Sequence, residues 1–352
     1  MISASENRPE RGAMTLTPEA SARPPLRSYC TGDGQSFGPA ATPAPRTGAT
    51  QRELQVIGAD EARWLTRAAL ADAGLCATDA QEVADALVDT SLRGIDTHGL
   101  RLLPQYLDEL ATGVANPTAM ISLVSDRGAG MLIDADGALG VVAGLAAARL
   151  AAQRAAKFGV AAVGVRNSNH FGAASVYTRR LARDGLVGIA VTSAPPRITA
   201  HGGVEPLFGT SPISVAAGDG NDEFAIDAGN SQAGLGHALA TAVTLLGSVL
   251  TGAPLDWQLS QVGEDAPGQG GGVGHLLLAL DPAAFTGQAQ FSAGLADLLG
   301  GVRAAAPADA RGPEPAPGAP QRAITLDERT ADVLSSLATE LGVPGPRSVF
   351  AD

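Results

Sequence analysis

Residues 160–192, VAAVGVRNSNHFGAASVYTRRLARDGLVGIAVT, decide the fold class because a strand pattern alternates there with a helical one. Residues 160–165 and 186–192 are short apolar runs typical of buried strands, and residues 173–183 between them have helical periodicity. Gly185 stands where the end of that helix needs a left-handed residue. A connection of this length predicts that the two strands pair in parallel.

The same alternation extends toward the N-terminus of this stretch. Residues 131–134 read as a strand and residues 138–157 as a long helix that ends at Gly159. The pattern therefore predicts a βαβαβ unit and an α/β fold. The loop 167–172 follows one strand and the turn 193–196 follows another, at the carboxyl ends where open α/β sheets bind ligands.

Two amphipathic helices are expected before this unit. A short apolar run at residues 54–57 precedes a helix that starts near Asp60, whose carboxylate is positioned to cap the first turn. A second helix is expected to begin at Thr78, since Thr78 and Gln81 have capping-box spacing. It ends at Gly94, so the two helices lead into the glycine-flanked loop 93–99, RGIDTHG.

Beyond Asp227 the pattern is weaker. We expect a helix over residues 235–250, a turn-rich stretch over 261–274 and a strand over 276–280. The glycine run 268–274 lacks Lys and precedes a strand, so it is not a phosphate-binding loop. A last helix is expected to open with a capping box formed by Thr325 and Glu328 and to end at Gly342.

These patterns divide the chain into four regions. Residues 1–53 hold seven prolines without apolar periodicity and are predicted to be a disordered extension, unless the start codon has been assigned too far upstream. Residues 54–125 are predicted to form a helical part that carries the loop 93–99, and residues 126–303 an α/β part. Residues 304–352 are predicted to be a linker and a C-terminal helix.

Composition and charge indicate which classes of binding partner and which cellular compartment to expect. The formal charge of -12 repels phosphate backbones and anionic lipid, so nucleic acid and membranes are not expected as partners. No apolar run approaches the roughly 20 residues that span a bilayer, and a soluble protein is expected. Only two cysteines, Cys30 and Cys76, occur, and no secretory signal opens the chain, which favours the reducing cytoplasm.

Three of the five histidines, His201, His237 and His275, lack polar neighbours in a ligand-like pattern and are expected to be structural or incidental. No histidine has the spacing of a zinc site. His98 differs because a hydroxyl, an imidazole and Arg101 come together in one glycine-flanked turn. Carbonyl reduction needs an acid near neutral pH and a planar cation that fixes a carboxylate. The alternative for this turn is a plain interhelix connection capped by Asp96.

His170 and Asp227 are two further candidates. His170 sits in the polar loop after a predicted strand, where a histidine buried for packing alone would be unusual, so a functional role is favoured. Asp227 ends an apolar strand pattern. A carboxylate there is either a helix cap or the orienter of an imidazole, because an ionised partner favours the protonated ring.

Three ordered motifs carry a family resemblance. They are RGIDTHG at residues 93–99, VRNSNHFGA at residues 165–173 and GGVEPLFGTSPI at residues 202–213. Together they resemble the successive signatures of the malate/L-lactate dehydrogenase family, over about residues 54–227 and again from residue 245. The resemblance implies a nicotinamide-binding fold distinct from the Rossmann domain, dimers, NAD or NADP as cofactor, and a small 2-hydroxy or 2-keto acid as substrate.

The resemblance also implies a role for each site residue. Thr97 and His98 would be relay and proton donor, with Thr97 where the family usually has Ser. Arg101 would clamp the substrate carboxylate, His170 would be a second active-site imidazole, and Asp227 the acidic member. The cofactor site would be lined by Thr192, Ser193, Gly209 and Thr210.

The resemblance assigns the α/β part, residues 126–303, to cofactor and substrate binding and implies that it is truncated, because the chain departs from the family after Asp227. There the family has some tens of residues with a Pro-rich loop, a Trp and a Lys-Gly-Tyr-Gly turn, whereas this chain passes almost at once into the next helix, with Leu235 about where the Lys would be. Two hypotheses follow. The chain is a cytoplasmic NAD(P)-dependent 2-hydroxy-acid dehydrogenase, or it is a catalytically impaired homologue that binds a ligand or a partner.

Overall fold

A computed structural model describes residues 53–199, 205–218, 223–228, 235–259, 271–305 and 323–350. At its centre, β3 (Gly130–Asp134) and β4 (Val160–Ser168) pair in parallel and are connected by α4 (Gly140–Phe158). The helix packs through a face of small residues, among them Ala147, Ala151 and Ala155, which lets it lie close to the sheet. Gly159 ends it with a φ of 78°. The predicted strand, helix and strand are thus confirmed.

The prediction of parallel pairing throughout is wrong at β5 (Val187–Thr192). The main sheet has seven strands in the order β2-β3-β4-β10-β5-β8-β9, and β10 (Val273–Leu280) lies between β4 and β5, antiparallel to both. Leu277 of β10 is opposite Val163 on one side and Ala190 on the other. A run that is apolar on both faces predicts a central strand but not its neighbours, so the sequence pattern could not reveal this insertion.

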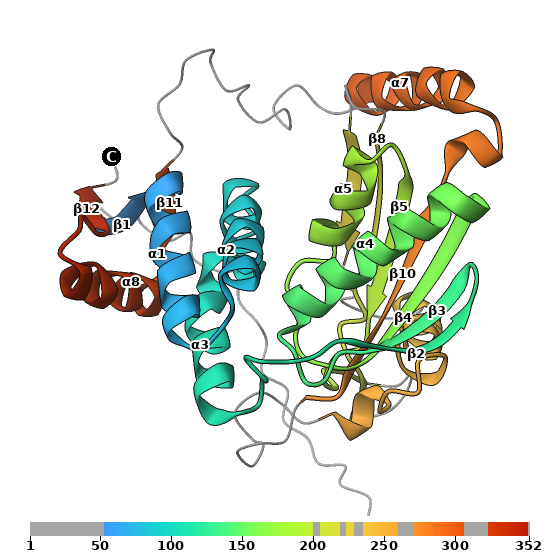
Figure 1. The fold of residues 1–352 in the computed structure, drawn as a ribbon. Coiled ribbons are helices and arrows are strands. Elements are labelled where there is room, and N and C mark those ends of the chain that lie inside the picture. Colours follow the sequence, from blue (N-terminus) through green and yellow to red (C-terminus); the bar gives the residue numbers. More distant parts are fainter. Residues whose placement is uncertain are drawn as a thin grey trace, which may run out of the picture. The chain divides into compact units, whose positions relative to one another are not determined.

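The sheet is covered by helices on both faces (Figure 1). Ala190 and Leu277 belong to the large core that also contains α4 residues, whereas their neighbours Val191 and Leu276 pack with Val243 of α6 (Leu235–Thr244). This alternation places α4 and α6 on opposite faces. The remaining elements of this part are β2 (Ser122–Arg127), α5 (Ser175–Arg183), β6 (Ile198–Thr199), β7 (Pro206–Phe208), β8 (Ile213–Gly218), β9 (Glu223–Ala228), η3 (Leu245–Val249), η4 (Asp256–Gln258), η5 (Pro282–Ala284) and α7 (Gln288–Ala305).

A helical part is built from both ends of the described chain. Its helices are α1 (Ala59–Asp72), α2 (Ala77–Leu92), α3 (Leu103–Thr112) and α8 (Glu328–Leu341). The strand β1 (Glu53–Gly58) pairs with β11 (Ala323–Leu326) and β12 (Arg347–Phe350), so the two ends lie side by side (Figure 1). The short helices η1 (Asp96–His98) and η2 (Leu100–Leu102) connect α2 to α3.

Three predicted helix starts are corrected. The first residue before α2 is Cys76, whose sulfur accepts a hydrogen bond from the amide of Asp79, so Thr78 lies inside the helix. Asp60 lies in the first turn of α1, and Thr325 belongs to β11. Asp327 caps α8 instead. Several cap-forming residues lie within two positions of each start, so the sequence pattern alone locates a helix start only to within one or two residues.

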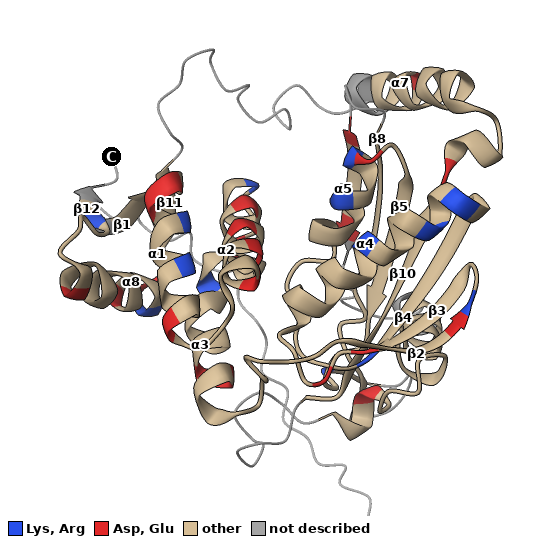
Figure 2. Ribbon diagram, in the orientation of Figure 1, with Lys and Arg blue, Asp and Glu red and all other residues tan. Residues whose placement is uncertain are grey.

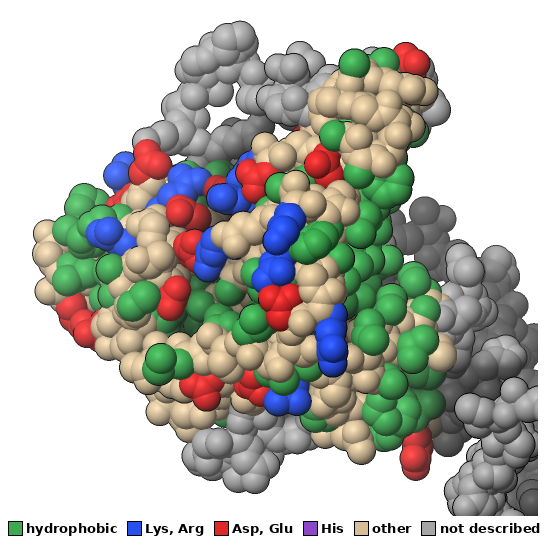
Figure 3. Space-filling view, turned by 45° about the vertical axis from the view of Figure 1, so that its right-hand side comes forward, with side chains coloured by type: hydrophobic (Ala, Val, Ile, Leu, Met, Phe, Trp, Pro, Cys, Tyr) green, Lys and Arg blue, Asp and Glu red, His purple; other side chains and the backbone are tan. Residues whose placement is uncertain are grey.

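Charged residues lie mainly on the helices and leave the long central strands almost free of charge (Figure 2). This agrees with strands that are buried on both faces. Figure 3 shows a face on which basic and acidic side chains are intermixed. Within the described ranges, no helix combines the length and the apolar character that crossing a membrane requires.

Some predictions concern residues outside the described ranges. These are the extension up to residue 52, His201, most of the turn-rich stretch 261–274 and most of the linker 304–320.

Candidate active site

The structure brings the two predicted imidazoles together. His98 lies in η1 of the helical part, and His170 lies in the loop after β4 of the main sheet. Their ring centroids are 5.9 Å apart and the ring planes differ by 26°. Both rings therefore line one site, although the residues are far apart in the sequence.

The turn that carries His98 is held against α2. The hydroxyl of Ser91 accepts a hydrogen bond of 2.9 Å from the amide of Leu100. A Cβ atom at Gly99 would lie 2.1 Å from that hydroxyl, so only glycine allows this approach. The glycine of the motif thus fixes the distance between η1 and α2.

The orientation of His98 is set by its neighbour. The Thr97 hydroxyl lies 3.0 Å from Nδ1 of His98, which leaves Nε2 for a ligand. Burial lowers the pKa of His98, and the negative charge of Asp227 partly opposes this effect. The ring is therefore mainly neutral at neutral pH but can still exchange a proton.

His170 is fixed by Tyr106 of α3. The Tyr106 hydroxyl lies 3.2 Å from Nδ1 of His170, and the Tyr106 side chain is fully buried. Burial lowers the pKa of His170 to about 4, and the positive charges of His98 and Arg197 act in the same direction. His170 is thus a neutral imidazole near pH 7, with Nε2 free of that contact.

The loop that contains His170 is held in place by Asn169. Its buried side-chain amide donates to the carbonyl oxygens of Gly137 at 2.7 Å and Ala138 at 3.0 Å, and its oxygen accepts from the amide of Gly271 at 2.8 Å. A Cβ at Gly140 would lie 2.2 Å from the carbonyl oxygen of Asn169. The start of α4 therefore packs directly against this loop.

Asp227 forms the helix cap that was one of its two predicted roles. Its carboxylate accepts a hydrogen bond of 2.8 Å from the amide of Ser175, the first residue of α5. It acts on His98 through its charge. The carboxylate therefore stabilises the α5 N-terminus. Its charge also limits the lowering of the His98 pKa that burial causes.

Arg101 is exposed in η2, between the buried side chains of Leu100 and Leu102. Its guanidinium forms no hydrogen bond or ion pair with another described residue. It lies three residues after His98 and is available to a ligand.

The four residues predicted to line the cofactor site differ in whether their side chains are free to contact a ligand. Thr192 and Ser193 are buried, and their hydroxyls bond to His275 and to the backbone of Gly274. Gly209 is buried and Thr210 is exposed. Thr210 thus offers a side chain, and the first three residues shape the site through their backbone and packing.

Three residues near the site were not predicted as functional: Tyr106, Arg197 and His275. The exposed Arg197 follows the turn after β5, at an edge of the sheet where ligand-binding loops gather, and this position was the signal that could have identified it. His275, expected to be structural, is fully buried and bonds Thr192 at 2.7 Å and Ser168 at 2.9 Å. Burial lowers its pKa to about 3, so it stays neutral.

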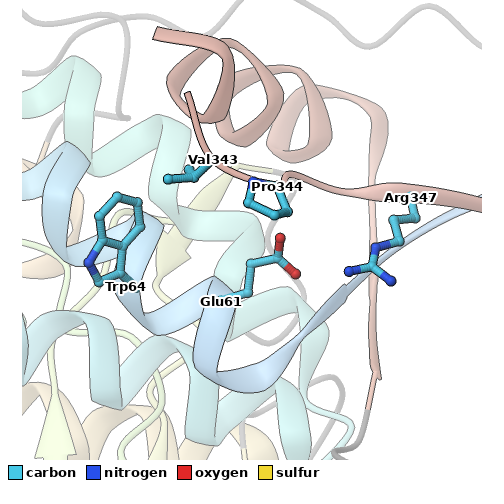
Figure 4. Close-up of a pocket in the computed structure, with 5 residues that line it drawn as sticks. All are labelled: Glu61, Trp64, Val343, Pro344 and Arg347. Atoms are coloured by element: carbon cyan, nitrogen blue, oxygen red, sulfur yellow. The ribbon is translucent and has the colours of Figure 1, made fainter. Parts of the chain in front are cut away.

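A surface hollow of about 390 Å³ lies elsewhere, between α1 and the turn that leads into β12 (Figure 4). It is lined by Glu61, Trp64, Val343, Pro344 and Arg347. None of the predicted site residues lines it. Volume alone therefore does not identify the site, and the side-chain chemistry around His98 and His170 does.

Comparison with known proteins gives a consistent result. The sequence profile described as malate/L-lactate dehydrogenase matches residues 57–238 and 234–336. The two matched stretches meet where the sequence lacks the segment expected after Asp227.

Individual relatives are dehydrogenases. Malate dehydrogenase of Pyrococcus abyssi is 38% identical over 158 residues, which cover 45% of this chain and 44% of that protein. The (2R)-3-sulfolactate dehydrogenase (NADP(+)) of Chromohalobacter salexigens is 31% identical over 279 residues, which cover 66% of this chain and 83% of that protein. The chain thus spans less than half the length of the Pyrococcus abyssi relative that it matches.

The fold is similar to that of malate dehydrogenase from Pyrococcus horikoshii OT3. The TM-score is 0.73 at 24% identity, and the match covers 82% of this chain and 96% of that one. This likeness confirms the predicted α/β fold of the family, which is distinct from the Rossmann domain.

A buried carboxyl beside the site predicts an unusual pH dependence of stability. Glu109 is 3% exposed, and burial raises its pKa to about 7. Because the folded state holds this proton more tightly than the unfolded chain, stability from Glu109 is lost as pH rises from about 4.5 through 7. Glu109→Gln should raise the free energy of unfolding by about 2–3 kcal/mol at pH 8 and much less at pH 5.

Urea unfolding of both proteins at the two pH values measures this difference. Exposed Asp72→Asn is the control and should give no such pH-dependent gain. Equal effects of Glu109→Gln at pH 5 and pH 8 would show that Glu109 ionises normally in the folded protein.

Proposed function

This chain belongs to the malate/L-lactate dehydrogenase family, and we propose that it transfers a hydride between NAD(P) and a small 2-hydroxy or 2-keto acid. The observation that carries the proposal is the pair of imidazoles, His98 and His170, each with a hydroxyl on Nδ1. Such a pair can bind and protonate a carbonyl oxygen. Relatives named for NAD(+) and for NADP(+) both occur, so the choice between the two cofactors stays open.

The residues at the site fit a dinucleotide in their chemistry. Thr210 is exposed, and Arg197 lies next to Phe208 through a backbone hydrogen bond of 2.7 Å. An exposed hydroxyl and a guanidinium are donors that phosphate groups accept readily. When bound, the nicotinamide ring supplies or takes up the hydride. We assign Thr210 and Arg197 to hold the cofactor, together with the backbone at Ser193 and Gly209.

The protein's own residues supply the proton. His98 Nε2 gives a proton to the substrate oxygen during reduction and takes it back during oxidation. Thr97 keeps Nδ1 of His98 occupied and thereby fixes the ring. Asp227 stabilises the imidazolium that forms, because its charge favours the protonated ring.

His170 has a different role. It remains neutral near pH 7, so its Nε2 can donate a hydrogen bond to the carbonyl oxygen when Tyr106 donates to Nδ1. This contact polarises the carbonyl and orients it toward His98. The acid group of the substrate binds Arg101, which has a planar fork suited to a carboxylate.

The missing segment after Asp227 is expected to weaken cofactor binding. One lost charge-assisted contact costs roughly 1.5–3 kcal/mol, or about ten- to a hundredfold in affinity. We therefore propose binding of NADH in the high micromolar range or weaker, and slow turnover. Arg197 is a described cation that can compensate, since its charge already acts on His170.

We also propose that the chain forms a homodimer in the cytoplasm. The outer side of η3 exposes Leu245, Val249 and Leu250, which are 56%, 57% and 62% exposed. Adjacent apolar side chains with this exposure favour a protein partner. Only two cysteines occur in the chain, and Cys76 is a free thiol, which suits a reducing compartment.

The activity is tested by following nicotinamide absorbance at 340 nm with malate, (2R)-3-sulfolactate and ureidoglycolate, and with the corresponding keto acids, each with both cofactors. Turnover of one of these acids supports the proposal. Tight binding of NADH or of an acid without turnover would instead favour the impaired homologue.

The proton-donor role of His98 is tested by its replacement. His98→Ala should lower kcat by about 10²-fold or more and leave the dissociation constant for NADH nearly unchanged, because general acid/base catalysis contributes this much. Thr97→Ser is the matched control and should keep most of the activity, since it retains the hydroxyl. Parallel losses of kcat and NADH affinity in His98→Ala would remove His98 from this role.

The substrate-binding role of Arg101 is tested by its replacement with Lys. Arg101→Lys should raise KM for the acid more than it lowers kcat, because one ammonium cannot copy a bidentate guanidinium. Arg127→Lys, at an exposed position on β2, should leave KM unchanged. A KM that stays the same for every acid in Arg101→Lys would show that Arg101 does not bind the substrate.

The proposed dimer interface is tested by the replacement of Val249. Val249→Asp should convert the dimer to a monomer in light scattering coupled to gel filtration, because a charge would be buried in the interface. Phe285→Asp, at a side chain that is 65% exposed on another element, should leave the mass unchanged. A dimeric Val249→Asp protein would place the interface elsewhere.

A further inference from the structure

A buried carboxylate contacts the loops that we assign to cofactor binding. Asp256 opens η4 and is 0% exposed. One of its oxygens, Oδ2, accepts hydrogen bonds from the amide of Gly209 at 2.9 Å and from the hydroxyl of Thr244 at 3.1 Å. The backbone of Ala194 donates a further hydrogen bond to the carboxylate.

These bonds join segments that are far apart in the sequence. Ala194 follows β5, Gly209 follows β7 and Thr244 ends α6. The first two segments also touch directly, since a Cβ at Gly209 would lie 2.3 Å from the carbonyl oxygen of Ala194. Asp256 therefore fixes the distance between the backbones of the two loops that contain Ala194 and Gly209.

The second oxygen of Asp256 indicates that this residue is not present for packing alone. Oδ1 is buried and has no hydrogen-bond partner among the described residues. Burial raises the pKa of this carboxyl. A buried acid with half of its acceptors unused is costly, so its presence here calls for a compensating contribution. What an apolar side chain cannot supply is the acceptor for Ala194 and Gly209.

We propose that Asp256 is the positioning residue of the cofactor subsite: its carboxylate holds the Ala194 and Gly209 backbones so that Arg197 and Thr210 flank the bound dinucleotide. The inference rests on the proposed function for the identity of the ligand. Asp256 acts through these loops and does not itself touch the cofactor.

Calorimetric titration with NADH compares the wild-type protein with Asp256→Asn and Asp256→Leu. Asparagine keeps an oxygen acceptor of the same shape and places its amide where Oδ1 has no partner, so its affinity should stay within about threefold of wild type. Leucine leaves the donors of Ala194, Gly209 and Thr244 without an acceptor and should weaken binding at least about tenfold. KM for the keto acid should change much less.

The control is Asp327, which accepts hydrogen bonds from the amide and the hydroxyl of Thr330 at the start of α8. Asp327→Leu removes the same kinds of bond and should leave NADH affinity unchanged. Equal weakening in Asp327→Leu and Asp256→Leu would reduce the effect to general destabilisation and would overturn the proposal. Wild-type affinity in Asp256→Leu, or weakening in Asp256→Asn as large as in Asp256→Leu, would overturn it as well.

A second readout does not need the cofactor. Trp257 packs on Phe208 with ring centroids 6.4 Å apart, next to Gly209. Trp64 is the only other tryptophan, so a Trp64→Phe background makes the emission report on this contact alone. Asp256→Leu should shift the emission to longer wavelength, and Asp256→Asn should restore it. If wild type fails to bind NADH, the proposed cofactor is wrong; an unshifted Asp256→Leu spectrum would refute the positioning role.

Discussion

The site depends on one hydrogen bond between two parts of the chain that are built separately. Tyr106 belongs to α3 of the helical part, His170 follows β4 of the main sheet, and their 3.2 Å contact sets the position of one relative to the other. Tyr106 is fully buried and His170 is half-buried, so breaking the bond would leave the buried Tyr106 hydroxyl without a partner, at a cost of about 1–3 kcal/mol. Through this bond the loop with His98 comes to lie opposite His170.

A second polar contact supports the site from within the sheet. His275 of β10 bonds Ser168 of β4 and Thr192 of β5, and its ring stacks on Phe171 at 4.5 Å. Because β10 separates β4 from β5, this one neutral imidazole links the ends of three adjacent strands. The loops that leave β4 and β5 therefore start from a rigid edge, which catalytic positioning requires.

Much of this arrangement could be predicted from the sequence. The glycine-flanked loop with His98 and the loop with His170 were both expected to serve one site, and they do meet. The helix and strand patterns were also placed within a few residues of their observed bounds. Local periodicity carries this information, because it reflects which side of an element is buried.

Contacts between distant residues could not be predicted. The insertion of β10, the bond between Tyr106 and His170 and the burial of Asp256 all depend on which segments become neighbours. An aromatic residue in an amphipathic helix and an aspartate near a turn look ordinary in sequence. Thr192 and Ser193 were expected to line the cofactor site, whereas the fold uses their hydroxyls for internal hydrogen bonds.

The central claim is that His170 is a neutral imidazole held by Tyr106 and presented to the substrate. Nuclear magnetic resonance of protein labelled with ¹³C and ¹⁵N in its five histidines measures ring protonation and tautomer directly. The His170 resonance is assigned by its loss in His170→Gln. We predict that the His170 ring stays neutral until the pH approaches about 4 and that its resonance shifts when NADH and a keto acid are added. A His170 ring that titrates near pH 6.5 and does not respond to these ligands would contradict the claim.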